Sequence, residues 1–160
     1  MCSSDLAGIL GCGPVVLGTS EECAKILRDP REPGEIAREI RAAKGKLPGF
    51  GHHVHKPLDP RAERILELAD ARGVSGEHVA LARALRDAAA EAWGRPLTMN
   101  VSMPIAAVML DLGFPASTVK AVPILARTAS LLAHLAEERE QPLGFLMAGA
   151  AEDAIRYEGP

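Results

Sequence analysis

The stretch PGFGHHVHKPLDPRAERILELAD, Pro48 to Asp70, joins a histidine-rich loop to an amphipathic helix. Its glycines and prolines predict a loop or extended segment up to Asp59. Asp59 suits the position that caps a helix and Pro60 suits the first helical position, so a helix is predicted from Pro60 to about Arg72. The loop carries three histidines within four positions, which a folded core does not require. The stretch therefore needs a functional explanation.

The composition is that of a folded helical protein. Hydrophobic residues make up 48% and charged residues 24% of the chain, as in globular proteins. Aromatic residues are scarce at 3%, whereas strands are enriched in aromatic and β-branched residues. At 160 residues the chain is long enough for one domain with a core, or for a piece of a larger protein.

Apolar residues with helical spacing predict further helices on both sides of the opening stretch. Ser20 is predicted to cap the first helix, Gly113 to end the most apolar one, and Pro123 to kink or divide the longest. No strand pattern is found, so the predicted fold class is all-α. The predicted helices cover residues 21–28, 35–44, 60–72, 76–93, 100–112, 115–140 and 143–157.

Several classes of partner are disfavoured by charge and patterning. The formal net charge of −3, without a basic stripe, argues against nucleic acid. The uncharged run from Leu6 to Gly18 is too short to span a bilayer and follows no basic region, so no membrane partner is expected. Cys2, Cys12 and Cys23 are odd in number and lack CxxC spacing, which fits unpaired thiols in a reducing compartment. A cytoplasmic chain is predicted.

The histidines alone leave three interpretations open. His53 and His55 point the same way in an extended segment and suggest a metal pair, although no third ligand is evident nearby. Alternatively, the histidines cap loop carbonyls at the surface. In the third interpretation a histidine in the glycine-flanked loop gives or takes a proton near neutral pH. Arg61, at the start of a helix, is suited to bind a carboxylate there.

A longer pattern indicates a family. GFGHHVHKPLDPR, which places His52 nine residues before Arg61, resembles the G-[FY]-G-H-x-V-x-[RK]-x-x-D-P-R signature of the citrate synthase superfamily. The resemblance continues through TMNVSMPIAAVMLDLGFP and ILARTASLLAHLAEE, and covers about Gly11 to Tyr157. The short citryl-CoA lyase-like members are the most similar, with a related ending around LAEEREQPLGFLM.

The resemblance implies an all-α, citrate synthase-like fold with a small domain and part of the large helical domain. It assigns residues 1–19 to the truncated end of a large-domain segment, 20–110 to the small domain with the histidine motif, and 111–160 to C-terminal helices of the large domain. Relatives carry helices before the point where this chain begins, so an N-terminally truncated chain is expected. The resemblance also implies a homodimer.

The implied reaction joins acetyl-CoA to oxaloacetate through citryl-CoA, or cleaves citryl-CoA to those two. His52 matches the histidine that hydrogen-bonds the oxaloacetate carbonyl, as acid in condensation or base in cleavage. Arg61 and Arg127 match arginines that bind substrate carboxylates. The coenzyme A thioester is a substrate, and no metal or covalently bound cofactor is implied. The positions that match coenzyme A-binding residues are Pro48, Gly49, Phe50, Gly51 and Lys56.

Three family residues are replaced in this chain. Ser102 stands where the family has its general-base aspartate, Val16 or Leu17 where it has a first catalytic histidine, and Gln141 where it has a further arginine. A serine hydroxyl cannot act as the carboxylate base that deprotonates the acetyl methyl group. Cleavage is less demanding, because its first proton leaves a hydroxyl. Two hypotheses follow: a citryl-CoA lyase-like enzyme, or a non-catalytic relative that binds coenzyme A or a carboxylate. A plain helical interaction domain would leave the opening stretch unexplained.

Overall fold

A computed structural model describes residues 18–156 of the chain. The prediction of an all-α fold is confirmed, since this part holds seven α-helices and one short 3-10 helix. Its β structure is limited to one isolated antiparallel bridge between Phe50 and Met99. The elements are α2 (Thr19–Leu27), α3 (Pro33–Ala42), α4 (Pro60–Ala71), α5 (Glu77–Trp93), α6 (Ser102–Asp111), η1 (Ala116–Thr118), α7 (Ala121–Glu140) and α8 (Gly144–Ala154).

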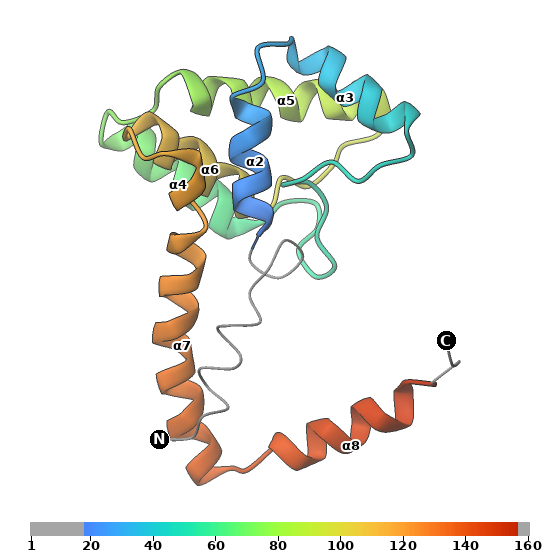
Figure 1. The fold of residues 1–160 in the computed structure, drawn as a ribbon, viewed down its shortest axis with the longest axis vertical. Helices are drawn as coiled ribbons and strands as arrows, with labels where there is room; N and C mark the ends of the chain where they lie inside the picture. The colour runs from blue at the N-terminus through green and yellow to red at the C-terminus, as the bar shows by residue number, and fades with distance from the viewer. Residues whose placement is uncertain (1–17, 157–160) are drawn as a thin grey trace.

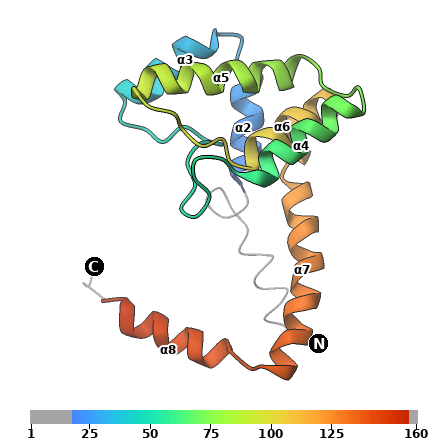
Figure 2. The same ribbon diagram turned by 180° about the vertical axis from the view of Figure 1, so that it is seen from behind.

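Helices α2 to α6 pack into one body, and α7 leads away from it to α8, as Figures 1 and 2 show. Helix α6 lies at the centre of the body, where it packs against α2, α4 and α5. Its sequence SMPIAAVMLD is apolar almost throughout, and Met103, Pro104, Ala106 and Ala107 are fully buried. A helix that is apolar on nearly all sides is expected to be surrounded by other elements. Gly113 follows with φ of 85°, as predicted for the residue that ends this helix.

Two details of the predicted helices are wrong. Ser20 does not cap α2, which begins at Thr19 with Gly18 in the capping position. Ser20 lies on the same buried face of α2 as Cys23 and Leu27, three and seven residues further on. Its side chain therefore faces the core and not the unpaired backbone N–H groups at the start of the helix. The segment predicted as one long helix is divided, but ahead of Pro123. Pro123 lies in the first turn of α7, where a backbone N–H needs no helical partner, so it causes no kink.

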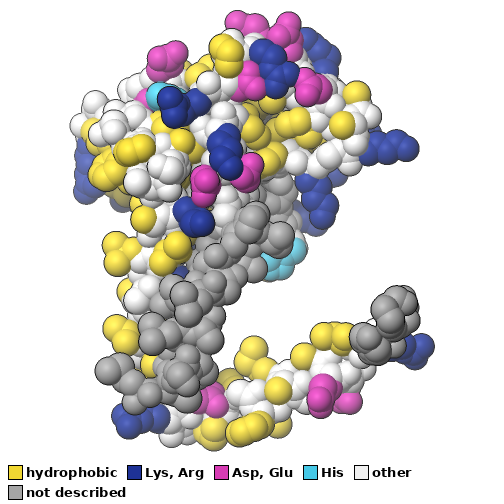
Figure 3. Space-filling view, viewed as in Figure 1, with side chains coloured by type: hydrophobic (Ala, Val, Ile, Leu, Met, Phe, Trp, Pro, Cys, Tyr) yellow, Lys and Arg dark blue, Asp and Glu magenta, His cyan; other side chains and the backbone are white. Residues whose placement is uncertain are grey.

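Helices α7 and α8 expose a broad apolar surface, visible as yellow side chains along both helices in Figure 3. Phe145 is 95% exposed and Leu125 is 73% exposed. Contiguous apolar surface of this kind marks a site of association. The segment Ala116–Glu140 is also long and apolar enough for a membrane span by length and composition, a test that core helices pass as well. The other exposed large apolar residues of α7, α8 and their connection are Leu132, Leu135, Leu143, Leu146 and Met147.

The end of α6 is joined to the start of α5 by Asp111. Its carboxylate accepts hydrogen bonds from the backbone N–H groups of Gly76 at 2.7 Å, His78 at 2.9 Å and Val79 at 3.0 Å. The His78 ring also contacts it, with Nδ1 2.8 Å from the oxygen. Burial acts to raise the pKa of Asp111, but the hydrogen bonds from His78, Val79 and Gly76 outweigh it and hold that pKa below its usual value. Asp111 thus caps α5 from a distant part of the sequence.

We expect Asp111→Asn to lower the free energy of unfolding at pH 7 by about 1–2 kcal/mol, because the α5 cap loses its charge and one of its two acceptors. Urea denaturation followed by circular dichroism measures the change. Asp87→Asn, an exposed change of the same kind on α5, is the matched control. Equal stability of the two variants would contradict the capping role.

Candidate functional site

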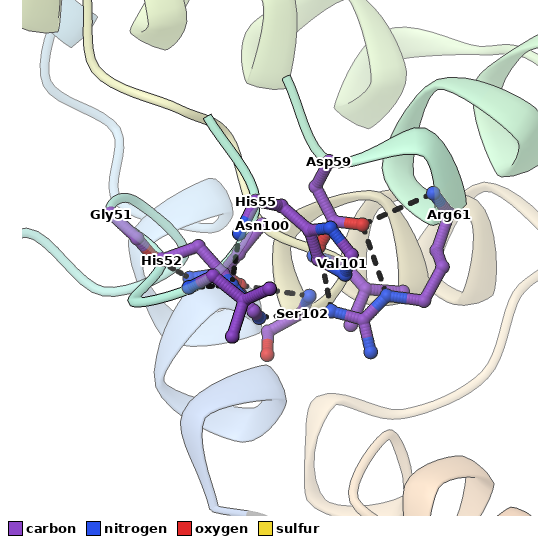
Figure 4. Close-up of polar contacts among 9 residues, drawn as sticks. Gly51, His52, His55, Asp59, Arg61, Asn100, Val101 and Ser102 are labelled. Atoms are coloured by element: carbon purple, nitrogen blue, oxygen red, sulfur yellow. Dashed lines mark hydrogen bonds and ion pairs between the residues drawn. The ribbon is translucent and has the colours of Figure 1, made fainter. Parts of the chain in front are cut away.

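The histidine loop, residues 48–58, is fixed to the segment that leads into α6 (Figure 4). Gly51 N–H donates to the Thr98 carbonyl at 2.7 Å, and Asn100 N–H donates to the Gly49 carbonyl at 2.9 Å. The Asn100 side-chain amide donates to the Gly51 carbonyl at 3.0 Å, and the Thr98 hydroxyl donates to the Pro57 carbonyl at 2.8 Å. These bonds hold both ends of the loop against one short extended segment.

Gly49 allows this loop to approach the core closely. Its φ is 80°, in the left-handed region that favours glycine. A Cβ atom at this position would lie 2.8 Å from Cys23 Sγ and 2.8 Å from Met103 Cε, closer than any such contact tolerates. The loop therefore rests on α2 and α6 only because residue 49 has no side chain.

Asp59 connects the loop to both neighbouring helices. Its side chain is fully buried and caps α4 as predicted, accepting from Arg61 N–H at 3.1 Å. It also accepts from Arg61 Nε at 3.0 Å and Nη2 at 2.8 Å, and from Val101 N–H at the start of α6 at 3.1 Å. Burial acts to raise the pKa of Asp59, yet these hydrogen bonds and the Arg61 charge lower it to about 2. The carboxylate is therefore ionised and fully engaged, and it orients the Arg61 guanidinium.

His52 lies against that guanidinium, with Nε2 at 3.1 Å from Arg61 Nη2. The other ring nitrogen, Nδ1, accepts backbone N–H groups from Val54 at 3.1 Å and His55 at 2.9 Å. A nitrogen that accepts two hydrogen bonds carries no proton, so the neutral ring carries its proton on Nε2. Two donors, Nε2–H and the Arg61 N–H, then face each other, and no acceptor in the described part of the chain, residues 18–156, is shared by them. An oxygen atom of a bound ligand would satisfy both.

The neighbouring side chains favour the neutral state of His52. The His53 ring stacks on it with centroids 4.7 Å apart, and the His55 ring lies at 4.6 Å. Partial burial, followed by the charges of His55 and His53 and a smaller contribution from Arg61, lowers the pKa of His52. The ring is therefore a neutral hydrogen-bond donor near neutral pH. Within residues 18–156, no group of three or more histidine, cysteine or acidic side chains is placed to hold a metal ion.

Ser102 begins α6, one residue after Val101, whose N–H donates to Asp59 (Figure 4). Its backbone N–H donates to Asn100 Oδ1 at 3.0 Å, and its hydroxyl is the only functional group that its side chain offers. Asp59 cannot replace a missing base, because its oxygens already accept four hydrogen bonds. Val16 and Leu17 lie outside the described residues.

The remaining predicted residues are spread more widely. Lys56 and Gly51 line a cavity with His52, whereas Pro48, Gly49 and Phe50 line a separate one of about 320 Å³. Arg127 is exposed on α7 and makes no polar contact with His52 or Arg61. Gln141 is exposed at the end of α7. The structure thus brings His52 and Arg61 together, but not Arg127.

Sequence reasoning identified Asp59 only as a helix cap and did not identify Asn100 or Thr98 as residues that hold the loop. The motif spacing shows that Asp59 lies two residues before Arg61, which is compatible with their pairing. The bonds to Val101, Gly51 and Pro57 join positions more than 40 residues apart, so local sequence patterns do not reveal them.

The family model described as "Citrate synthase, C-terminal domain" matches residues 1–146. The chain belongs to the citrate synthase family. The resemblance predicted from the histidine motif is therefore confirmed. Among citrate synthases, "Putative citrate synthase 2" of Mycobacterium tuberculosis is 31% identical over 97% of this chain and 42% of its own length. "Citrate synthase" of Saccharolobus solfataricus is 28% identical over 81% of this chain and 37% of its own length. The chain thus spans about two fifths of these two relatives.

Solved structures support the fold of this citrate synthase family member. Citryl-CoA lyase from Hydrogenobacter thermophilus superposes with a TM-score of 0.79 at 27% identity, covering 98% of this chain and 62% of that one. A ternary complex of citrate synthase from Thermoplasma acidophilum with carboxymethyl coenzyme A and oxaloacetate gives a TM-score of 0.67 at 26% identity, covering 93% and 41%. The citrate synthase-like fold is confirmed. The predicted domain boundaries and the roles of the site residues stay predictions.

We expect Asp59→Asn to lower the free energy of unfolding at pH 7 by about 2 kcal/mol, since charged hydrogen bonds contribute about 1.5–3 kcal/mol and Arg61 is half exposed. The folded-state pKa is depressed, so the ionised form stabilises the fold above the unfolded-state pKa of about 3.9. That contribution is lost as the pH falls through about 2. The difference between the two proteins should therefore shrink as the pH falls.

Urea denaturation at a series of pH values measures this difference. Asp153→Asn, on the exposed side of α8, is the matched control and should show no such pH dependence. A constant difference between wild type and Asp59→Asn down to pH 2 would contradict the role of the Asp59 charge.

Proposed function

We propose that this chain acts as an acyl-CoA carbon–carbon lyase or synthase of the citryl-CoA lyase type, which cleaves citryl-CoA to acetyl-CoA and oxaloacetate or runs the reverse condensation. The observation that carries the proposal is the pair of donors, His52 Nε2–H and the Arg61 guanidinium, 3.1 Å apart and sharing no acceptor among residues 18–156. The reaction has one oxygen that is a hydroxyl in citryl-CoA and a carbonyl in oxaloacetate. That oxygen is an acceptor in both states.

In the cleavage direction, the hydroxyl proton leaves as the carbon–carbon bond breaks, and the electron pair of that bond forms the enolate of acetyl-CoA. The developing negative charge on the oxygen would lie within hydrogen-bond reach of both His52 and Arg61, where preorganised donors stabilise it most. Because His52 Nδ1 is held as an acceptor, the ring favours this donor role over that of a base. The hydroxyl proton would pass to water, and a proton from water would complete the acetyl methyl group.

The serine at position 102 favours cleavage over condensation. Condensation begins with removal of a proton from the acetyl methyl group, which needs a carboxylate-strength base. Among the residues around His52, Ser102 offers only a hydroxyl and Asp59 is engaged by four donors. Cleavage ends with protonation of the same carbon, which is strongly basic as an enolate and needs less assistance.

A second candidate function is binding of coenzyme A or a carboxylate without turnover. It is favoured by Ser102 and by the position of Arg127, which is exposed on α7 and does not reach His52 or Arg61. A single arginine beside His52 is enough to bind one carboxylate, whereas oxaloacetate carries two.

The catalytic proposal predicts that His52→Ala lowers citryl-CoA cleavage by about 100-fold or more, because one oxyanion donor is lost. Oxaloacetate release, coupled to malate dehydrogenase and followed by NADH consumption, measures the rate. His134→Ala, on α7 with its side chain 64% exposed, is the matched control and should retain the rate. Undiminished turnover by His52→Ala would contradict the proposal. No turnover by wild type that still binds coenzyme A would favour the binding function.

We also propose that α7 and α8 associate with a second copy of the chain. Their exposed leucines, together with Phe145 and Met147, form the kind of apolar surface that homodimers bury. Light scattering coupled to size exclusion should give about twice the mass of 16.9 kDa, and Phe145→Glu with Leu132→Glu should shift it toward the monomer. A wild-type monomer at micromolar concentration would contradict this assembly.

A further inference from the structure

The proposed cleavage of citryl-CoA needs a group that receives the hydroxyl proton, and the residues already placed around His52 do not supply one. His52 itself carries its proton on Nε2, and its Nδ1 already accepts N–H groups from Val54 and His55. Asp59 accepts four hydrogen bonds, and Ser102 offers only a hydroxyl. A proton acceptor on the protein must therefore come from another side chain.

The imidazole of His55 lies beside His52 and is available to take a proton. Its ring centroid is 4.6 Å from that of His52, the ring planes are tilted by 33°, and the residue is half-buried. Among residues 18–156, its two ring nitrogens have no hydrogen-bond or ion-pair partner, whereas the rings of His52, His78 and His134 each contact a side chain. A neutral imidazole without such partners keeps one nitrogen lone pair free, which is able to accept a proton.

His55 is better placed for this role than His53, the other imidazole beside His52. The His53 ring stacks nearly parallel on that of His52, with 17° between the planes, and the residue is exposed. An exposed imidazole exchanges its proton with bulk water, whereas the partial burial of His55 limits that competition.

The backbone of the loop fixes where His55 lies. Its N–H donates to His52 Nδ1 at 2.9 Å, and two residues further on the Pro57 carbonyl accepts the Thr98 hydroxyl at 2.8 Å. The first of these bonds uses the backbone of His55 and not its ring, so a substitution of the side chain leaves the donor that orients His52 in place. The two imidazoles can therefore be tested separately.

We infer that His55 is the catalytic base that receives the hydroxyl proton of citryl-CoA during cleavage, an inference that rests on the proposed function. The O–H bond breaks as its proton moves to a His55 ring nitrogen, and its electron pair forms the carbonyl of oxaloacetate. The electron pair of the breaking carbon–carbon bond passes to the acetyl-CoA enolate, which then takes a proton from water. His55 thus replaces bulk water as the first proton acceptor.

The spacing of the three side chains suits this step. His52 Nε2–H and the Arg61 guanidinium, 3.1 Å apart, donate to the reacting oxygen. An oxygen hydrogen-bonded to His52 lies within reach of a ring whose centroid is 4.6 Å from that of His52, directly or through one water. Two donors and one acceptor then surround the oxygen that changes from hydroxyl to carbonyl.

Citryl-CoA cleavage by the full chain, coupled to malate dehydrogenase, tests the assignment. His55→Ala should lower kcat by about 100-fold, as for a lost general base, with KM close to wild type because His52 and Arg61 still bind the substrate. Imidazole added to the buffer should restore part of the His55→Ala rate, since it can enter the space of the lost ring. His55→Gln, which fills that space without a base, should lose as much and gain nothing from imidazole. His134→Ala, exposed on α7, should keep the wild-type rate with and without imidazole.

Several results would overturn the inference. An unchanged kcat in His55→Ala, or a reduced kcat that imidazole does not restore, would exclude a base, and a raised KM alone would assign His55 to binding. A loss of the same size in His53→Ala would show that stacking on His52, and not proton transfer, sets the rate. If circular dichroism shows that His55→Ala does not fold, His55→Gln decides: a lower kcat at unchanged KM supports the base, and an unchanged kcat overturns it.

The wild-type protein separates this inference from the proposed function. Cleavage of citryl-CoA by wild type and equally by His55→Ala would keep the activity and reject the base. Wild type without turnover would reject the activity and the base together.

Discussion

The buried carboxylate of Asp59 is the interaction on which the site depends. A charge with no solvent exposure is costly unless its oxygens are fully hydrogen-bonded. Here the backbone and side chain of Arg61, at the start of α4, and the backbone of Val101, at the start of α6, supply the donors, so two helix starts converge on one carboxylate. The need to satisfy this charge fixes Arg61 beside His52. The carboxylate that caps α4 is therefore the same one that orients the Arg61 guanidinium.

That geometry leaves His52 and Arg61 incompletely satisfied in the free protein. Backbone N–H groups of Val54 and His55 occupy Nδ1, which forces the proton of the neutral ring onto Nε2, toward the guanidinium. Both donors lie at a partly exposed surface, where water can serve them, so the cost of this arrangement is small. A ligand oxygen that replaces the water meets donors already in position. Preorganisation of this kind favours binding of an oxygen that carries negative charge.

Sequence reasoning succeeded where the deciding interactions are local. The start of α4 followed from Asp59 and Pro60, and the course of α5 followed from its apolar spacing. Ser20 was wrongly predicted to cap α2. Serine favours the capping position, but its small side chain also fits the buried face of this helix. The Asp111 cap on α5 spans more than 30 residues, so no helix-start signal reveals it. For the site, the sequence motif identified His52 and Arg61. That Asp59 orients Arg61 toward His52, and that the His52 proton is on Nε2, follow only from the three-dimensional contacts.

Position 102, where the family resemblance implies an aspartate, also bears on the electrostatics of the site. An aspartate there would add a negative charge to the segment that anchors the histidine loop, and a nearby negative charge raises a histidine pKa and favours the charged ring. Burial and the charges of His55, His53 and Arg61 lower the pKa of His52, and they outweigh the opposite effect of the ionised Asp59. Lys56 and Arg95 add positive potential from the adjoining cavity. The site therefore combines a neutral donor with nearby positive charge, an arrangement suited to an anionic ligand. Among residues 18–156, none of the groups around His52 is suited to remove a proton from carbon.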